Sequence, residues 1–289
     1  LSRENDIDPT YTFTTASKIL NKADDELATQ FLLTELQAPN GTATYKKGVL
    51  KALDLHLAVN GNQKLALKAS LELWKIVHAE NPGSEEEFWA LFKFGNHCLT
   101  GKLYEDASKA LKDARAMALK LNKPDLAANC SRSLGYALSA GGNYEEALKL
   151  FEEAIRFTRA SPQKTMLGFE LQNIASTYIQ LNEWDKAIAA LKEADGLARN
   201  EYEKGLLQAM FSGLTFKQAL LTNPAQPDLS HAIAFQEKAV AAKLQNDSAG
   251  KEFALLGATH DYITLASYQI LAGELDDAEV SLQQATRGA

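Results

Sequence analysis

The sequence is poor in cysteine, proline and methionine. Of 289 residues, two are cysteine, seven are proline and three are methionine. The two cysteines, Cys98 and Cys130, exclude a disulfide framework, and their separation does not match the spacing of zinc ligands. Both lie among apolar residues with helical spacing, so we expect them to be small buried hydrophobic side chains. Such sparse cysteine fits a bacterial cytoplasm or a periplasm.

Long hydrophobic runs are also missing. Charged residues interrupt each apolar stretch within a few positions, which excludes a membrane-spanning helix of about 20 apolar residues. The formal net charge of −7 argues against nucleic acid as a partner, because that affinity comes mainly from Lys and Arg neutralising phosphates. Because long apolar runs are missing, we also expect no direct insertion into a membrane. The cytoplasm is the favoured location, with the periplasm open if a targeting segment was removed.

Signatures of catalysis are absent. The sequence has no Gly-x-Ser-x-Gly, His-Glu-x-x-His, Walker or dinucleotide-binding motif. No histidine has a second metal ligand four residues away, and the adjacent pair His97-Cys98 would point about 100° apart on a helix. Acidic pairs such as Glu145-Glu146 fit helix starts and solvated faces better than a general acid–base pair. We therefore expect no enzyme activity, no catalytic residue, no metal site and no cofactor.

Strong helix formers fill the chain. Ala, Leu, Lys, Glu and Gln dominate, and apolar residues recur at the spacing of one helix face, as at Ala147, Leu148, Phe151, Ala154 and Ile155. Helix breakers separate these stretches at short intervals, among them Pro82-Gly83, Lys123-Pro124, Ser161-Pro162 and Asn223-Pro224. Strand signals are nearly absent. The pattern predicts antiparallel helix pairs joined by short turns.

A period of 40 residues runs through the middle of the chain. Phe94-Gly95, Leu134-Gly135 and Ile174-Ala175 are each 40 residues apart. Four further columns follow at constant offsets: Tyr104, Tyr144 and Trp184; Ala107, Ala147 and Ala187; Leu111, Phe151 and Leu191; Ala114, Ala154 and Ala194. The small residues let paired helices approach closely, and the aromatic residue begins the second helix. One pair cannot bury both apolar faces, so neighbouring pairs must stack.

This pattern resembles the tetratricopeptide repeat. The resemblance is carried by Leu134, Gly135, Tyr144, Ala147, Phe151 and Ala154, and it returns at Leu265, Ala266, Leu275, Ala278, Leu282 and Ala285. It implies an all-α, right-handed superhelix of helix pairs. The period exceeds the usual length of about 34 residues, as in the bacterial regulator and kinesin-light-chain-like branches.

The period also divides the chain. Residues 1–45 are expected to form an N-terminal helical cap with a degenerate repeat, and residues 46–289 a repeat array. The expected units lie near 47–87, 88–127, 128–167, 168–207, 208–258 and 259–289. The fifth unit carries an insert at 223–229. Because the chain starts LSREND without methionine, we expect a targeting segment to have been removed or the chain to be part of a longer protein.

The resemblance implies a binding surface on the concave face, formed by the first helix of each unit. Transferred by position, the expected protein- or peptide-binding residues are Trp89, Phe92, Lys93, Asn96, Asn129, Arg132, Tyr136, Phe169, Gln172 and Asn173, with Ser133, Ser176, Phe216, His260 and Thr264 at equivalent positions. Amides can pair with a peptide backbone and aromatic rings can take its side chains. The aromatic residues have a second interpretation, as packing between long helices. The four polar residues Lys93, Asn96, Asn129 and Arg132 do not have the spacing of the family's carboxylate clamp.

Two functions follow from this surface. The first is a non-enzymatic module that binds a peptide or protein segment in a concave groove, as the sensory or regulatory region of a larger bacterial signalling protein. The alternative is a structural scaffold or homodimerisation module that acts through its end repeats.

Overall fold

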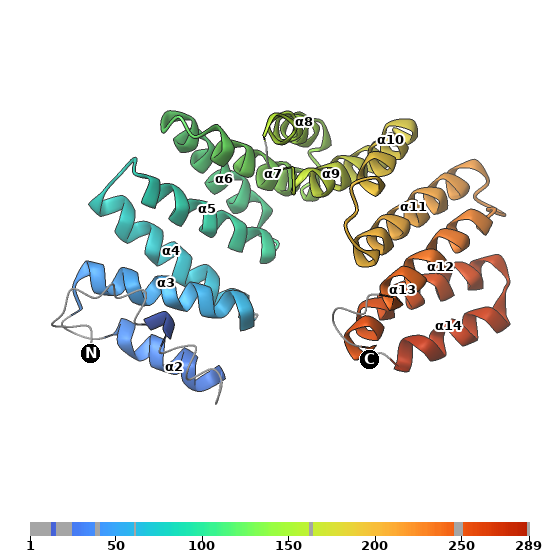
Figure 1. The fold of residues 1–289 in the computed structure, drawn as a ribbon, viewed down its shortest axis with the longest axis horizontal. Coiled ribbons are helices and arrows are strands. Elements are labelled where there is room, and N and C mark those ends of the chain that lie inside the picture. The colour runs from blue at the N-terminus through green and yellow to red at the C-terminus, as the bar shows by residue number, and fades with distance from the viewer. Residues whose placement is uncertain are drawn as a thin grey trace. The chain divides into compact units, whose positions relative to one another are not determined.

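The computed structural model describes residues 13–15, 25–37, 41–60, 62–161, 164–245 and 251–287 (Figure 1). Within these ranges every regular element is a helix, which confirms the all-α fold class. Much of the predicted N-terminal cap, at residues 1–12, 16–24 and 38–40, lies outside the described residues, as does Pro162.

The helices follow one another with short connections. They are α2 (Asp25–Leu36), α3 (Ala43–Asn60), α4 (Gln63–Glu80), α5 (Glu85–Thr100), α6 (Tyr104–Lys120), α7 (Pro124–Ala140), α8 (Tyr144–Ala160), α9 (Leu167–Gln180), α10 (Trp184–Asp195), α11 (Glu201–Thr222), α12 (Ser230–Leu244), α13 (Lys251–Ala272) and α14 (Leu275–Arg287). The expected insert at 223–229 is the loop between α11 and α12.

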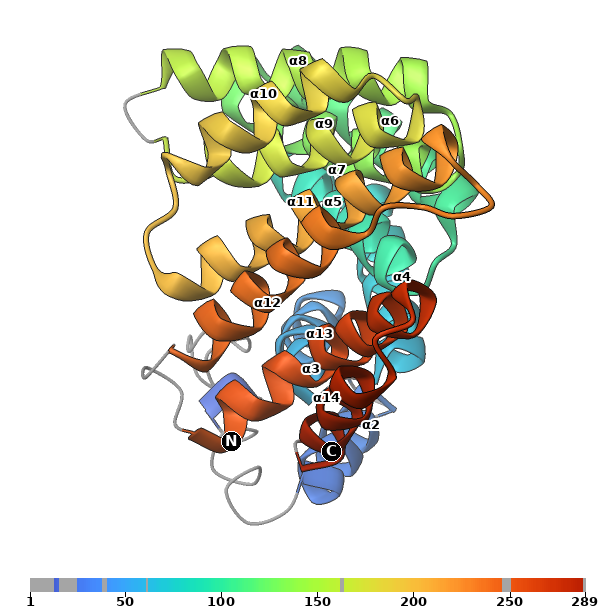
Figure 2. The same cartoon turned by 90° about the vertical axis from the view of Figure 1, so that its right-hand side faces the viewer.

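The chain forms two compact units, residues 1–157 and residues 158–289, and each is described by itself. In the first unit, α2 to α7 pack on their neighbours in chain order. In the second, α9 to α14 do the same, and α12 lies between α11 and α13 (Figure 2). This nearest-neighbour packing is the solenoid arrangement that the repeat pattern predicts.

The turns within the pairs α5–α6, α7–α8, α9–α10 and α13–α14 share one backbone geometry. One residue per turn has a positive φ, and these residues share one column: Lys102 at 59°, Gly142 at 84°, Asn182 at 59° and Gly273 at 84°. The next residue donates its amide to a carbonyl five positions back, as from Asn143 N to Leu138 O at 2.8 Å. This closes the first helix with a left-handed cap. The second helices then begin at the predicted column, at Tyr104, Tyr144, Trp184 and Leu275.

Burial follows the same columns. The alanines Ala107, Ala147 and Ala187 are fully buried, and the large residues Leu111, Phe151 and Leu191 are at most 1% exposed. Residues 131–140 of α7 and 171–180 of α9 have the same sequence of buried, half-buried and exposed positions. The 40-residue period is therefore a period of packing as well as of sequence.

The small residue of the first helix sits at a close approach between paired helices. A Cβ atom added at Gly135 would lie 2.8 Å from Cε1 of Phe151, and one added at Gly95 would lie 2.8 Å from Cγ of Leu111. Such contacts are too short for carbon atoms in a packed core. Glycine in these two helices is therefore required by the side chain opposite.

We expect Gly135→Ala to lower the free energy of unfolding by about 1–3 kcal/mol, because the added methyl group overpacks against Phe151. Adding Phe151→Leu should recover part of this loss, since the repeat near 168–207 already combines Ala175 with Leu191 in the core. Urea unfolding of the double-mutant cycle measures the coupling. In the control Gly213→Ala, where the new Cβ meets no atom within 4 Å, stability should rise. Equal costs of Gly135→Ala with and without Phe151→Leu would contradict the close-approach explanation.

Candidate functional site

The ten predicted binding residues lie on α5, α7 and α9, the first helices of three successive pairs. None of the ten is buried. Trp89 is 41% exposed, Tyr136 49% and Phe169 40%, so these three aromatic side chains are not core residues. We call the exposed sides of the three helices the first-helix faces. Those of α5 and α7 belong to the first unit, and that of α9 belongs to the second.

On α5 the aromatic residues form one cluster. Phe92 stacks on the fully buried Phe88 with ring centroids 5.8 Å apart, and Trp89 meets Phe88 edge-on at 5.1 Å. Phe92 is partly buried and also packs against the core between α5, α6 and α7. Packing therefore holds Phe92, as the second interpretation of the aromatic residues expects, whereas Trp89 keeps a large part of its indole accessible.

Lys93 is held by an acidic residue of α3. Its Nζ lies 2.5 Å from Oδ2 of Asp54, whose other oxygen is 2.6 Å from Nε2 of His97. Burial of Asp54 alone would raise the pKa of its carboxyl, but the hydrogen bonds from His97 and Lys93 outweigh that and lower it. The Lys93 ammonium is therefore anchored to the neighbouring pair, with 45% of the side chain still exposed.

On α7 the polar residues are arranged along one side of the helix. Nη2 of Arg132 donates to Oδ1 of Asn129 at 3.1 Å, which orients both side chains. Tyr136 follows one turn later and is exposed. On α5, Nδ2 of Asn96 donates to the Phe92 carbonyl at 3.0 Å. The face thus presents one guanidinium, oriented amide oxygens and a phenol.

On α9 two amides are available to a ligand. The side chains of Gln172 and Asn173 are half-buried and make no hydrogen bond within the described part of the chain. Phe169 lies one turn before Asn173. Each amide offers both a donor and an acceptor, the pair of groups that a peptide unit needs.

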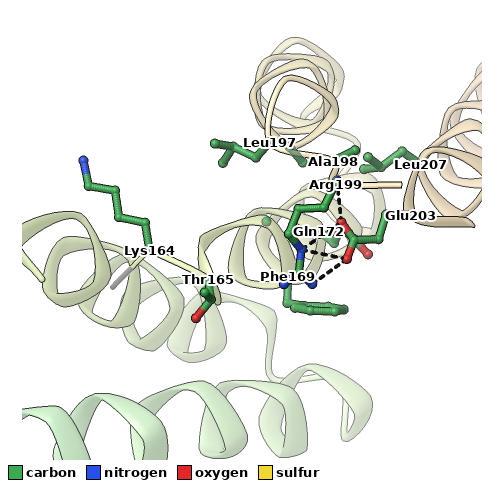
Figure 3. A pocket seen from close by; sticks show the side chains of 11 residues that line it. Lys164, Thr165, Phe169, Gln172, Leu197, Ala198, Arg199, Glu203 and Leu207 are labelled. Carbon is green, nitrogen blue, oxygen red and sulfur yellow. Dashed lines mark hydrogen bonds and ion pairs between the residues drawn. The ribbon is translucent and has the colours of Figure 1, made fainter. Parts of the chain in front are cut away.

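A small pocket opens beside this part of α9, within the second unit (Figure 3). Its volume is about 70 Å³. Its walls come from the first turns of α9, the end of α10, the connection that follows and the start of α11, and include Gly168, Phe169, Gln172, Ala194, Leu197, Arg199, Glu203 and Leu207. Two of the ten predicted residues, Phe169 and Gln172, line it.

The other side of the pocket comes from residues that the repeat period did not single out. Arg199 and Glu203 point toward one another, with Nη2 of Arg199 2.5 Å from Oε1 of Glu203 (Figure 3). Hydrogen bonds from the side chain and backbone of Arg199 lower the pKa of Glu203. Asn200 caps α11 by accepting from the Glu203 amide at 2.9 Å. The sequence signal was Asn200-x-x-Glu203, a helix-capping pattern that ties the connection to α11.

The two cysteines are buried, as expected from the sequence. Both are free, and desolvation raises the pKa of Cys98 to about 11 and that of Cys130 to about 12. Neither thiol is therefore a ready nucleophile near neutral pH. Among the described residues, three or more His, Cys, Asp or Glu side chains nowhere gather as metal ligands would. No helix in those ranges has the length and apolar character needed to cross a bilayer.

Comparison with known families identifies the repeats. A family model described as tetratricopeptide repeat matches residues 86–160 and, in an overlapping register, 127–200. These ranges hold the three clearest copies of the 40-residue pattern. No curated protein matches the chain in sequence.

Solved structures share the fold at low sequence identity. The apo form of RapI has a TM-score of 0.67 and 11% identity, covering 96% of this chain and 97% of its own. The apo form of the quorum sensor NprR from B. thuringiensis has a TM-score of 0.63 and 14% identity, with 96% and 86% covered. A Rap protein complexed with competence and sporulation factor has a TM-score of 0.53 and 13% identity, with 96% and 76% covered.

Proposed function

We propose that the chain, whose residues 86–200 match the tetratricopeptide repeat family, binds a protein or peptide segment along its first-helix faces. The observation that carries the proposal is the exposure of Trp89 and Phe169, which are equivalent positions of the 40-residue period, and of Tyr136 on α7, beside half-buried amides. Large aromatic side chains and an oriented arginine are the groups that dominate binding energy in protein interfaces. We assign no catalytic step to the chain.

The electrostatics of these faces favour a polypeptide over a nucleic acid. Arg132 is the only arginine among the ten residues, and Lys93 is paired with Asp54. The net charge of −7 leaves no excess of cations to neutralise phosphates. Amides and aromatic rings instead match the mixed polar and apolar surface of an extended peptide. Support also comes from the fold neighbours, of which one is a quorum sensor and another is complexed with a named factor.

The test is selection of ligands from a random peptide library displayed on phage, followed by titration of the selected peptides. We expect Arg132→Ala and Asn173→Ala each to weaken binding about tenfold, the effect of losing about 1.4 kcal/mol of hydrogen bonding to the ligand. Isothermal titration calorimetry measures the dissociation constants. Native mass spectrometry of protein purified from its host shows whether a discrete ligand copurifies and is lost in the same variants.

The matched control is Arg156→Ala on α8, a second helix, where the arginine is exposed. This variant should bind the selected peptides with unchanged affinity. A library that yields no peptide, or peptides whose affinity falls equally in the Arg156→Ala and Arg132→Ala variants, would contradict binding at the first-helix faces.

The finer proposal is that the chain is the sensory or regulatory region of a larger bacterial signalling protein. The likeness of its fold to the quorum sensor NprR supports this assignment. We also retain the division into an N-terminal cap and six repeat units as a proposal. Demonstrating that these residues form a complete native gene product would contradict the regulatory assignment.

A scaffold is the second candidate function, favoured by one observation. On the last helix, Leu275 is 65% exposed and Leu282 43%, and because they are seven residues apart they share one side of the helix, an apolar surface that a second copy could cover. Light scattering separates the two functions. A doubled mass that is unaffected by Arg132→Ala would favour the scaffold, and a monomer that captures peptides would favour the binding module.

A further inference from the structure

The pocket beside α9 has an apolar deep wall and an entrance flanked by exposed apolar side chains. Ala194 and Leu207 are each 1% exposed, so the deep wall is part of the core. Phe169 and Leu197, in contrast, are 40% and 41% exposed. Covering such apolar surface is favourable by about 25 cal/mol per Å². The site is therefore suited to an apolar group that enters between Phe169 and Leu197.

Gly168 lines the pocket and leaves open space beside it. A Cβ atom added at this glycine would meet nothing within 4 Å, and its φ lies outside the left-handed region. The residue is therefore not required by turn geometry or by a close helix approach, unlike Gly135. Any side chain placed at position 168 would project into open space beside the pocket wall.

The volume of the pocket and the charges in its lining restrict the kind of chemical group that it can bind. The volume of about 70 Å³ is roughly half that of a cavity of about 150 Å³ that holds benzene, which favours a side chain smaller than that of phenylalanine or tryptophan. Three charged residues line the pocket: Arg199 and Glu203 neutralise one another, and the side chain of Lys164 extends away from Phe169 and Arg199 (Figure 3). A charged group would lose hydration without finding an unpaired opposite charge there. A branched aliphatic group satisfies both limits.

The amide of Gln172 forms a polar edge of the pocket, and it is suited to bind the peptide backbone next to an aliphatic side chain. Gln172 lines the pocket, and its amide makes no hydrogen bond within the described residues. A peptide whose aliphatic side chain entered the pocket would bring its backbone N–H and C=O within reach of this edge. The amide can accept from the first and donate to the second.

We propose that this pocket takes one aliphatic side chain, of leucine, isoleucine or valine size, from the bound segment, and that Gln172 holds the adjacent peptide backbone. The inference rests on the proposed function, because it names the side chain that the binding module selects. It adds residues of the connection after α10, Leu197 above all, to the binding surface.

The direct test uses N-acetyl-leucine methylamide as the probe, followed by changes in the backbone NMR signals of the chain. Shifts should cluster on residues 168–172 and 197–199, and they should saturate at millimolar concentration. The alanine and tryptophan analogues should shift these signals at least fivefold less at equal concentration. Equal shifts with all three probes, or leucine shifts that map elsewhere, would overturn the proposal.

The decisive variant is Gly168→Leu, which places a branched side chain in the open space beside the pocket wall. It should abolish the leucine-probe shifts and weaken the selected peptides at least tenfold. Gly213→Leu is the matched control, since Gly213 is also helical with nothing within 4 Å of an added Cβ but lies outside the pocket. That variant should behave like the wild type.

A second variant guards against misfolding. Leu197→Asp changes an exposed residue of the connection and places a carboxylate at the entrance, so it should also abolish the leucine-probe shifts while thermal unfolding stays close to wild type. Peptides that bind wild type and Gly168→Leu equally would overturn the pocket and leave the proposed function intact. A library that yields no peptide, together with normal leucine-probe shifts, would instead contradict the proposed function alone.

Discussion

Asp261→Ala is expected to lower the free energy of unfolding of the second unit by about 3–5 kcal/mol. The Asp261 carboxylate of α13 pairs with Nζ of Lys243 on α12, and these side chains are only 3% and 9% exposed. Nε2 of Gln236 donates to the same carboxylate at 3.0 Å. Removing the carboxylate leaves a buried ammonium with its main partner gone, which costs more than the lost attraction itself.

Two comparisons separate this effect from a general loss of charge. The exposed pair Arg159 and Glu193 has side chains 53% and 43% accessible, so Glu193→Ala should cost less than about 1 kcal/mol. The double variant Lys243→Met with Asp261→Leu removes both buried charges and should recover most of the stability. Urea unfolding followed by circular dichroism measures all three. If Asp261→Ala costs no more than Glu193→Ala, the buried pair is not a stabilising contact between α12 and α13.

The fold was predictable because successive helix pairs repeat the same pattern of small, aromatic and apolar residues. The close approach of Gly135 to Phe151, the start of α8 at Tyr144 and the burial of Ala147 all follow from one column pattern. Prediction was weaker after residue 200, because α11 runs for 22 residues and the columns lose their spacing. There the start of the helix depends on Asn200, a cap, and not on the period.

The candidate site was predictable only as far as the helical period reaches. The resemblance to the tetratricopeptide repeat implies that Trp89 and Phe169 face a ligand, and both side chains are exposed in the structure. Periodicity carries no information on contacts between helices far apart in sequence, so the partner of Lys93, Asp54 of α3, could not be foreseen. Leu197 was missed for a similar reason, since it lies in a connection where no repeat position applies.

Leu191→Ala should lower the free energy of unfolding by about 2–5 kcal/mol, whereas Leu282→Ala should cost less than half as much. Both residues occupy one repeat column, but Leu191 is fully buried and Leu282 is 43% exposed. The two residues differ in which helices cover them. Helix α10, which carries Leu191, is packed by both α9 and α11, whereas α14, which carries Leu282, packs on α13 at the end of the described array. Urea unfolding at several protein concentrations measures both costs. Equal costs would contradict this account, and a cost at Leu282 that grows with concentration would show that a second copy covers α14.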